Sequence, residues 1–305
     1  QSRERIGRRT AAALGYNECV TYSFIDRAAA QLFGGGTADV MLENPISADL
    51  SHMRPDLLPG LLRAAARNQA RGMMDLALCE VGHAFHGGEP GEQHLQVAGL
   101  LIGQTGPRDP HGTRRAVDVF DIKADVEAIL AAMGAPTKMQ TLRGAPGWWH
   151  PGRHGILCLG PQKRLAVFGE LHPKVLKAMD VKGPAMAFTI FAEEIPMPKA
   201  TGASRGAVEM AEYQAVERDF AFVVEAGVEA AVLVNAAAGA DKALITDVRV
   251  FDEFIGGSLG EGRKSIALSV RLQPRDRTLT EEEIEAVAAK VVDKVTKASG
   301  GTLRG

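Results

Sequence analysis

Three prolines that stand close together, Pro45, Pro55 and Pro59, constrain this chain more than any other feature of it. Proline fixes φ and has no backbone N–H, so residues 43–62 cannot join a hydrogen-bonded ladder and are predicted to form a shaped loop. Polar turn-forming residues between the prolines can hydrogen-bond neighbouring backbone groups. The last proline then opens an amphipathic helix that is expected to run to about Arg71. From the residue types alone, an ordinary loop followed by a helix start is an equally good interpretation.

The bulk composition indicates a soluble globular protein. The chain has 305 residues, 46% of them hydrophobic and 24% charged, which suits two domains of ordinary size. Its net charge of -2 provides no overall field that attracts nucleic acid, so a site for a polyanion has to be local. The three cysteines, Cys19, Cys79 and Cys158, are far apart and odd in number, which favours buried reduced thiols in a cytoplasmic protein. No apolar run is long enough to span a membrane, and an Arg-rich start without an initiator methionine suggests a piece of a longer polypeptide.

Residues 1–195 are predicted to combine helices and strands. Helices are expected at residues 2–14, 26–33, 59–71 and 118–133, and strands at residues 15–24, 75–85, 96–104, 155–159, 165–169 and 184–195. Residues 196–210 contain proline, glycine, serine and threonine with few apolar side chains, which is typical of a linker. The expected organisation is one domain over residues 1–195, a linker over 196–210 and a second domain over 211–305.

The second domain has a simpler pattern. Strands are predicted at residues 218–224, 244–254 and 265–273, helices at residues 228–238 and 280–297, and an edge strand within residues 300–304. Thr280 and Glu283 form a capping-box sequence at the start of the last helix. The order β-α-β-β-α-β is that of the ferredoxin-like split unit.

Basic residues gather around the third strand of this domain. The strongest local positive cluster of the chain, with Asp276 as its single acid, consists of Arg263, Lys264, Arg271, Arg275 and Arg277. Such a cluster fits a polyanion site, and solvated strand ends would give the same pattern. The glycines of residues 256–262 lie between two adjacent strands, which favours a hairpin loop over a nucleotide cradle.

Two groups of residues could suggest a metal site but have simpler explanations. Asp121, Asp125 and Glu127 lack further oxygen ligands, and acids near a helix N-terminus complement the macrodipole. The second group consists of His150, His154, Glu170 and His172. Pro151-Gly152 separates the first two histidines, so they cannot share a helical face. We expect the histidines to cap turns and satisfy buried backbone groups, and we predict no metal.

Several motifs, in a consistent order, resemble one family. The motifs that carry the resemblance in residues 1–195 are Asn44-Pro45-Ile46-Ser47, Met53-Arg54-Pro55, Glu80-Val81-Gly82, Phe120-Asp121-Ile122-Lys123 and Phe168-Gly169-Glu170-Leu171-His172-Pro173. This part resembles the synthetase-like core of the bacterial phenylalanyl-tRNA synthetase beta subunit. Residues 211–305, with Val250-Phe251-Asp252-Glu253-Phe254, resemble the ferredoxin-fold anticodon-binding domain that ends the same subunit. The fold implied is α+β: a class II synthetase-like antiparallel sheet with helices, followed by a ferredoxin-like βαββαβ domain.

The resemblance implies a subunit of phenylalanine-tRNA ligase, an α2β2 enzyme that joins phenylalanine to its tRNA with ATP and Mg. The chemistry of that enzyme resides in the alpha subunit, so this region would pack on alpha, bind the anticodon of tRNA(Phe) and hold no cofactor of its own. Catalytic class II domains carry an arginine that grips ATP where this chain has His86 after Phe85, and Leu171-His172-Pro173 offers no second one. The region is therefore expected to be non-catalytic.

The same resemblance names residues of an RNA site in the second domain. The residues that match family positions contacting anticodon bases are Ala221, Asp252, Phe254 and Ser265. Phe254 stands where a tyrosine is often found, so stacking is kept without a hydroxyl contact. The candidates for phosphate contacts are Arg263, Lys264, Arg275 and Arg277.

Two other classes of protein fit parts of the pattern. A free-standing class II enzyme would need the ATP-binding arginines that these motifs lack. A small-molecule-binding regulator, with a ferredoxin-like sensor and a degenerate synthetase domain, predicts a ligand pocket within residues 211–304 in place of a basic surface.

Overall fold

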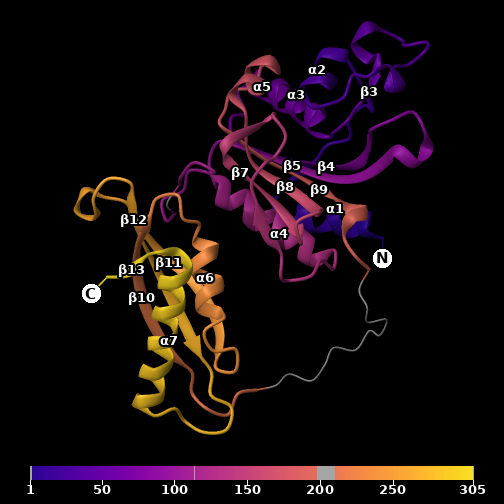
Figure 1. Cartoon of the computed structure of the whole chain (residues 1–305). Helices are drawn as coiled ribbons and strands as arrows, with labels where there is room; N and C mark the ends of the chain where they lie inside the picture. Colours follow the sequence, from indigo (N-terminus) through magenta and orange to yellow (C-terminus); the bar gives the residue numbers. More distant parts are fainter. Residues whose placement is uncertain (1, 113, 198–209, 305) are drawn as a thin grey trace. The chain divides into compact units, whose positions relative to one another are not determined.

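The computed structural model describes residues 2–112, 114–197 and 210–304 (Figure 1). Contacts within the chain divide it into two compact units, residues 1–201 and 202–305, and each is described by itself. Most of the predicted linker, residues 196–210, lies outside the described residues. No helix in the described part of the chain is long and apolar enough to cross a membrane.

A seven-stranded sheet forms the centre of the first unit. Its strands are β1 (Asn17–Glu18), β4 (Leu76–Phe85), β5 (Gln93–Ile102), β6 (Gln140–Leu142), β7 (Trp149–Leu159), β8 (Lys163–Leu171) and β9 (Ala185–Phe191). The order across the sheet is β1-β4-β5-β9-β8-β7-β6, and every pairing is antiparallel except that of β1 with β4. Two short strands, β2 (Phe24–Ile25) and β3 (His52–Met53), pair separately. The predicted α+β class with a large antiparallel sheet is confirmed.

Helices cover both faces of this sheet (Figure 1). They are α1 (Arg3–Ala13), α2 (Arg27–Leu32), α3 (Leu58–Gln69), α4 (Val119–Ala132) and α5 (Pro173–Ala178). One core joins the sheet to α2, α3 and α5 and includes Leu61, and a second joins it to α1 and α4 and includes Ile129. Because successive strand residues point to opposite faces, β4 contributes Leu78 to the first core and Cys79 to the second. Both faces of the sheet are therefore buried.

One buried arginine holds the proline-rich stretch to the sheet. Arg54 donates from Nη1 to Glu80 Oε1 at 2.7 Å and from Nε to the carbonyl of His83 at 3.0 Å. The side chains of Arg54 and Glu80 are 5% and 4% exposed, so neither charge has water as an alternative partner. Gly82 makes room for this contact, because a Cβ there would lie 2.7 Å from Arg54 Nη2. The arginine of one family motif and the Glu80-Val81-Gly82 motif thus form a single structural joint.

Asp56 lies in the same stretch, two residues before α3. Its Oδ1 accepts a hydrogen bond from the N–H of Leu58 at 2.9 Å, and its two oxygens accept from Thr189 Oγ1 at 3.3 and 3.2 Å. Burial raises the pKa of Asp56 to about 6. The helix therefore starts at Leu58, one residue before the predicted proline, with a buried carboxyl group beneath its first turn.

Residues 15–24 do not form the single strand predicted for them. β1 pairs with β4, whereas β2 pairs with β3 in a different sheet. Between them, Thr21 Oγ1 donates to Glu80 Oε2 at 2.7 Å. The alternation of β-branched and aromatic residues predicted one strand. Thr21, in the middle of the segment, bonds to the Glu80 side chain instead of joining a sheet, so the predicted strand is interrupted there. The sequence also missed β6, and β7 begins at Trp149 rather than at residue 155.

The second unit is a four-stranded antiparallel sheet with two helices. Its elements are β10 (Val216–Glu225), α6 (Ala230–Ala238), β11 (Ile245–Phe254), β12 (Arg263–Leu272), α7 (Glu281–Ser299) and β13 (Thr302–Leu303). The strand order β11-β12-β10-β13 and the element order β-α-β-β-α-β confirm the ferredoxin-like prediction. Residues 256–262 connect the paired strands β11 and β12, as predicted for a hairpin loop. Thr280 and Glu283 form the predicted capping box of α7.

Candidate nucleic-acid interface

The sheet of the second unit buries one face against its helices and presents the other as a surface. In β12, Ile266, Leu268 and Val270 belong to the core with α6 and α7. Successive residues of a strand point to opposite faces, so Ser265 and Ala267 lie on the face away from the helices. Every second residue of these strands therefore lies on this face.

The four predicted base-contacting residues meet at one end of this open face. The pairing of β11 with β12 sets Asp252 opposite Ala267 and Phe254 opposite Ser265. The pairing of β12 with β10 sets Ala267 opposite Ala221. Residues directly opposite in antiparallel strands share a face, so these side chains form two adjacent rows on one surface. The residues selected from sequence are therefore neighbours in space.

Small side chains occupy most of the positions of these rows on the two central strands, and we call them the floor. Ala221 and Ala267 occupy the two central strands, and Ser265 is only 5% exposed. Phe254, on the edge strand, is 43% exposed and stands beside this floor. Gly256 permits this position of the ring, because a Cβ there would lie 2.6 Å from the ring atom Cζ. The result is a shallow surface of small residues next to an accessible aromatic ring.

The predicted phosphate-contacting residues divide between the two faces of the sheet. Arg263 begins β12 at the Phe254 end and is exposed. Lys264, the next residue, belongs to the opposite face by the alternation of the strand, and its Nζ pairs with Glu253 at 3.1 Å. Of these two cations, only Arg263 lies on the face that carries Phe254.

The other two predicted cations follow the far end of β12. β12 runs on for seven residues from Ser265 to its end at Leu272, about 23 Å at the rise of an extended strand, and both arginines follow that end. Arg277 forms an ion pair with Glu283 and lowers the pKa of that carboxyl to about 2. The basic cluster expected from sequence is therefore two separate groups, because residues adjacent in the chain are spread along a strand. Arg277 is also committed to the start of α7.

One residue at this site, Arg304, was missed by the sequence analysis. Its backbone N–H donates to the carbonyl of Ala221 at 2.8 Å, just beyond the end of β13. Its guanidinium carbon lies 5.9 Å from the centre of the Phe254 ring. A partial signal was available, because the edge strand predicted over residues 300–304 places residue 304 on the same face as residue 302. Only the structure shows that Thr302 pairs with Val223 of the open face.

The histidines at positions 150, 154 and 172 accept hydrogen bonds from nearby backbone N–H groups. Nε2 of His154 accepts hydrogen bonds from the N–H groups of Gly144 and Ala145, each at 3.2 Å. In His150 and His172, Nδ1 accepts from the N–H group two residues further along the chain, at 3.1 Å in both cases. These bonds confirm that the histidines cap turns. Among the described residues, no three His, Cys, Asp or Glu side chains are placed to hold a metal ion.

The acids of α4 are also engaged in local contacts. Arg115 donates to both oxygens of Asp121, at 2.6 and 2.7 Å, and lowers the pKa of that carboxyl. Asp125 accepts a hydrogen bond from the hydroxyl of Tyr16 at 2.6 Å. Glu127 forms an ion pair one turn away within α4. Each acid thus has a structural partner of its own.

His86, which follows Phe85 where the resemblance implies an ATP-binding arginine in catalytic domains, is held by contacts of its own unit. Its Nε2 lies 3.2 Å from the carbonyl oxygen of Pro55, and its ring lies against that of His94, with centroids 5.0 Å apart. Cores on both faces of the sheet enclose the neighbouring strands. His86 thus takes part in contacts of its own unit, and Glu193 and Glu194 line the hollow beside it.

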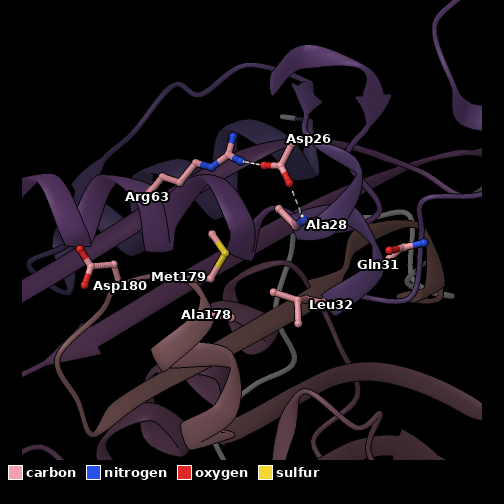
Figure 2. A pocket seen from close by; sticks show the side chains of 9 residues that line it. Asp26, Ala28, Gln31, Leu32, Arg63, Ala178, Met179 and Asp180 are labelled. Atoms are coloured by element: carbon pink, nitrogen blue, oxygen red, sulfur yellow. Dashed lines mark hydrogen bonds and ion pairs between the residues drawn. The ribbon is translucent and has the colours of Figure 1, made fainter. Parts of the chain in front are cut away.

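A hollow of about 540 Å³ on the first unit lies between α2, α3 and the end of α5 (Figure 2). Figure 2 shows Arg63 and Asp26 pointing toward each other at its rim, where they form an ion pair. Asp26 also caps α2 by accepting from the N–H of Ala29 at 2.8 Å. The floor is apolar and includes Met179. Two of the polar groups around this hollow therefore serve the local fold.

The second unit has a hollow of similar volume, about 540 Å³, on its open face. Its lining consists of Glu217, Arg218, Asp219, Arg249, Phe251 and Ser269. Charges of both signs line it, and the sheet face around it is open to solvent. This arrangement does not favour the alternative of a regulator with a pocket for a small molecule.

Two family models match the chain. The model described as the phenylalanyl tRNA synthetase beta chain CLM domain matches residues 1–192, and that of the ferredoxin-fold anticodon binding domain matches residues 211–304. Fold and matches together define a synthetase-like module joined to an anticodon-binding domain. The chain belongs to the phenylalanyl-tRNA synthetase beta chain family.

Curated relatives carry the same name. The phenylalanine-tRNA ligase beta subunit of Ruegeria pomeroyi is 71% identical over 305 residues, which are 100% of this chain and 38% of that protein. The beta subunit of Cereibacter sphaeroides is 66% identical, covering 100% of this chain and 38% of its own length. The chain thus spans 38% of the length of these relatives. Among solved structures, a pyrrolysyl tRNA synthetase of Desulfitobacterium hafniense is similar with a TM-score of 0.48 and 14% identity, covering 63% of this chain and 66% of that chain.

Proposed function

We propose that this chain is the part of a phenylalanine-tRNA ligase beta subunit that binds the tRNA anticodon through the open face of its second unit. The observation that carries the proposal is the convergence of Asp252, Phe254, Ser265 and Ala221 on that face, in the unit that matches the anticodon-binding family. Single-stranded loops present unstacked bases, which proteins hold by aromatic stacking and by hydrogen bonds to base edges. Phe254 supplies the ring, and Asp252 accepts from a base amino or imino group.

The cations around this face contribute unequally. Arg263 lies at the Phe254 end and is the best placed to meet a phosphate next to the stacked base. Arg275 lies at the far end of β12, where it would meet a more distant part of the RNA backbone. Lys264 and Arg277 are already paired with Glu253 and Glu283, which reduces what each can add to phosphate binding.

The complete enzyme would join phenylalanine to tRNA(Phe) with ATP and Mg, in the cytoplasm. We assign no catalytic residue, metal or cofactor to this region, and we place its domains at residues 1–195 and 211–305 with a linker between them. The support is that His86, beside the acids Glu193 and Glu194, stands where the resemblance implies an ATP-binding arginine, and that both faces of the seven-stranded sheet are buried. The chemistry would then belong to the alpha subunit, and this region alone should give no phenylalanine-dependent exchange between ATP and pyrophosphate.

We place the contact with the alpha subunit on an apolar surface of the first unit. Val20, Tyr22 and Ile46 are 92%, 77% and 92% exposed, and the first two line one hollow together with Leu50. Apolar side chains gathered on the surface of a soluble protein indicate an interaction site. Val20→Glu combined with Tyr22→Glu should prevent copurification with alpha, whereas Met73→Glu, at an exposed position after α3, should not. Unchanged copurification of the double variant would contradict this placement.

Phe254→Ala tests the RNA site in the complete beta subunit assembled with alpha. Loss of one stacking contact should weaken tRNA binding by about 1–3 kcal/mol with little change in salt dependence. Phe120→Ala, at an exposed phenylalanine of the first unit, is the matched control and should leave the tRNA affinity unchanged. Phenylalanine activation should stay intact in both variants. Equal tRNA affinity for Phe254→Ala and the unmodified enzyme would contradict the proposal.

A further inference from the structure

We propose that Arg304 is a second stacking residue of the open face, and that one RNA base is held between its guanidinium group and the Phe254 ring. This inference rests on the proposed anticodon-binding function and adds to it the second wall of a base-binding slot. The observation behind it is the 5.9 Å distance between the Arg304 guanidinium carbon and the centre of the Phe254 ring.

The two side chains reach this distance from opposite edges of the sheet. Phe254 belongs to β11, and the backbone N–H of Arg304 bonds to Ala221 beside β13, at the other end of the strand order. Three strand spacings separate those edges, or about 14 Å. Both side chains must therefore extend inward over the two central strands, where Ala267 and Ala221 keep the floor low.

The distance suits a slot that is closed in the free protein. A guanidinium within about 6 Å of a ring centre makes a favourable cation–π contact, so Arg304 covers the Phe254 ring when no RNA is present. A flat base needs carbon contacts of about 3.5 Å on each side, so the two groups must stand about 7 Å apart to hold it. The guanidinium therefore has to move outward by roughly 1 Å.

Arg304 is able to make that movement. Its backbone is fixed by the hydrogen bond to Ala221, and none of the ion pairs between described residues includes its guanidinium. A planar guanidinium stacks on bases as it does on aromatic rings. Insertion of a base thus replaces one cation–π contact by two stacking contacts. Asp252, opposite Ala267 in the neighbouring row, can then accept a hydrogen bond from the edge of that base.

The residues of the floor also support a base-binding slot, because most of them are small. The residues of the open face between the two walls are Ala267, Ala221, the buried Ser265 and the half-buried Val223 opposite it. Larger side chains at these positions would fill that space. Gly256 supports the Phe254 ring from the hairpin loop, since a Cβ at this position would meet the ring.

The test uses the complete beta subunit assembled with alpha, and an anticodon stem-loop RNA of phenylalanine tRNA that carries 2-aminopurine at one anticodon position at a time. Stacking quenches the fluorescence of this base analogue. Arg304→Ala should weaken binding about five- to tenfold and reduce the quenching at one position. Arg304→Lys keeps the charge but not the plane, so it should lose most of the same affinity. With Phe254→Ala in addition, the loss should be smaller than the product of the two single losses.

Arg271→Ala is the matched control, because Arg271 is an exposed arginine of the same face, opposite Glu217 and outside the slot. It should leave the quenching unchanged. A full recovery by Arg304→Lys, together with a lower salt dependence in Arg304→Ala, would assign Arg304 to a phosphate and overturn the inference. An unchanged affinity of Arg304→Ala would also overturn it. If Phe254→Ala has no effect either, the proposed function itself has failed, so the two failures are distinguishable. Equal thermal unfolding midpoints establish that each variant is folded.

Discussion

The two sheets of this protein are used in opposite ways. The seven-stranded sheet is packed with helices on both faces, whereas the four-stranded sheet has a helical core on one face. In the first, nearly all central strand residues are core, and even a charged residue such as Glu80 serves the packing. In the second, alternate residues reach the surface, so Phe222 packs inside while Phe254 stands on the open face. Similar strand sequences are therefore buried scaffold in the first unit and, on one face, accessible surface in the second.

This difference changes what a family motif signifies. Glu80 belongs to a motif that identifies the family, yet its carboxylate accepts hydrogen bonds from Arg54 and Thr21 within its own unit. In the second unit, the matching motif ends at Phe254, which is accessible. A motif identifies the family equally well in both cases, and the burial of its residues decides whether it points to packing or to a ligand.

The largest effect is expected from breaking the buried joint of the first unit. Glu80→Gln would leave the guanidinium of Arg54 buried without its anion, which should lower the free energy of unfolding by about 3–5 kcal/mol. Both tryptophans lie in the first unit, so their fluorescence during urea unfolding reports on it. Glu127→Gln, at an exposed pair of α4, is the control and should cost about 0.5 kcal/mol or less. A cost for Glu80→Gln no greater than that of the control would show that the joint is dispensable.

The contrast between packed and open faces can be measured within the second unit by itself. Phe222→Ala removes a ring with 0% exposure and should cost about 3–5 kcal/mol of stability. Phe254→Ala removes a ring from the open face and should change stability by about 0.5 kcal/mol or less. The rate of amide hydrogen exchange in β10 and β12 measures the stability of the second unit in both variants. Equal costs would mean that the open face is packed in solution.

A smaller effect is expected from the buried acid beneath α3. Burial raises the pKa of Asp56 to about 6, so the folded protein binds this proton more tightly than the unfolded chain does. Stability from this group is therefore present at low pH and is lost as pH rises from about 4 to about 6, by about 2–3 kcal/mol. Asp56→Asn keeps an acceptor for Leu58 and removes the titration.

The measurement is urea unfolding of both proteins across that pH range. The difference in unfolding free energy between the variant and the unmodified protein should shift in favour of Asp56→Asn as pH rises. Asp49→Asn, at an exposed acid of the same loop, should give a curve parallel to that of the unmodified protein. A parallel curve for Asp56→Asn would show that the carboxyl of Asp56 does not titrate in this window.

Local sequence patterns predicted most of the fold, because strand alternation and helix capping are encoded over a few residues. The ferredoxin-like order followed from such patterns, as did the capping box of Thr280 and Glu283. The prediction of one strand over residues 15–24 was wrong because a hydrogen bond from Thr21 to a distant strand outweighs the local alternation. The base-contacting residues came from resemblance. Arg304 was missed because its neighbour Phe254 is brought to it only by the order of the strands, which no short window of sequence contains.

The smallest expected effect separates the two ends of the open face. Arg275 is exposed and has no ion pair among the described residues, whereas Arg277 is held by Glu283. If the far end of β12 meets the RNA backbone, Arg275→Ala should lower the slope of log affinity against log salt by about 0.7, the contribution of one phosphate in single-stranded RNA.

Arg277→Ala is the matched control, since a paired arginine has less charge to offer a phosphate. It should change the salt slope by less than Arg275→Ala does, while weakening the start of α7. Tested in the complete beta subunit assembled with alpha, equal slopes for both variants and the unmodified enzyme would remove the far end from the RNA surface. The phosphate contacts would then be confined to Arg263 and its surroundings, beside the stacking ring, and the recognition surface of the second unit would be smaller than its open face.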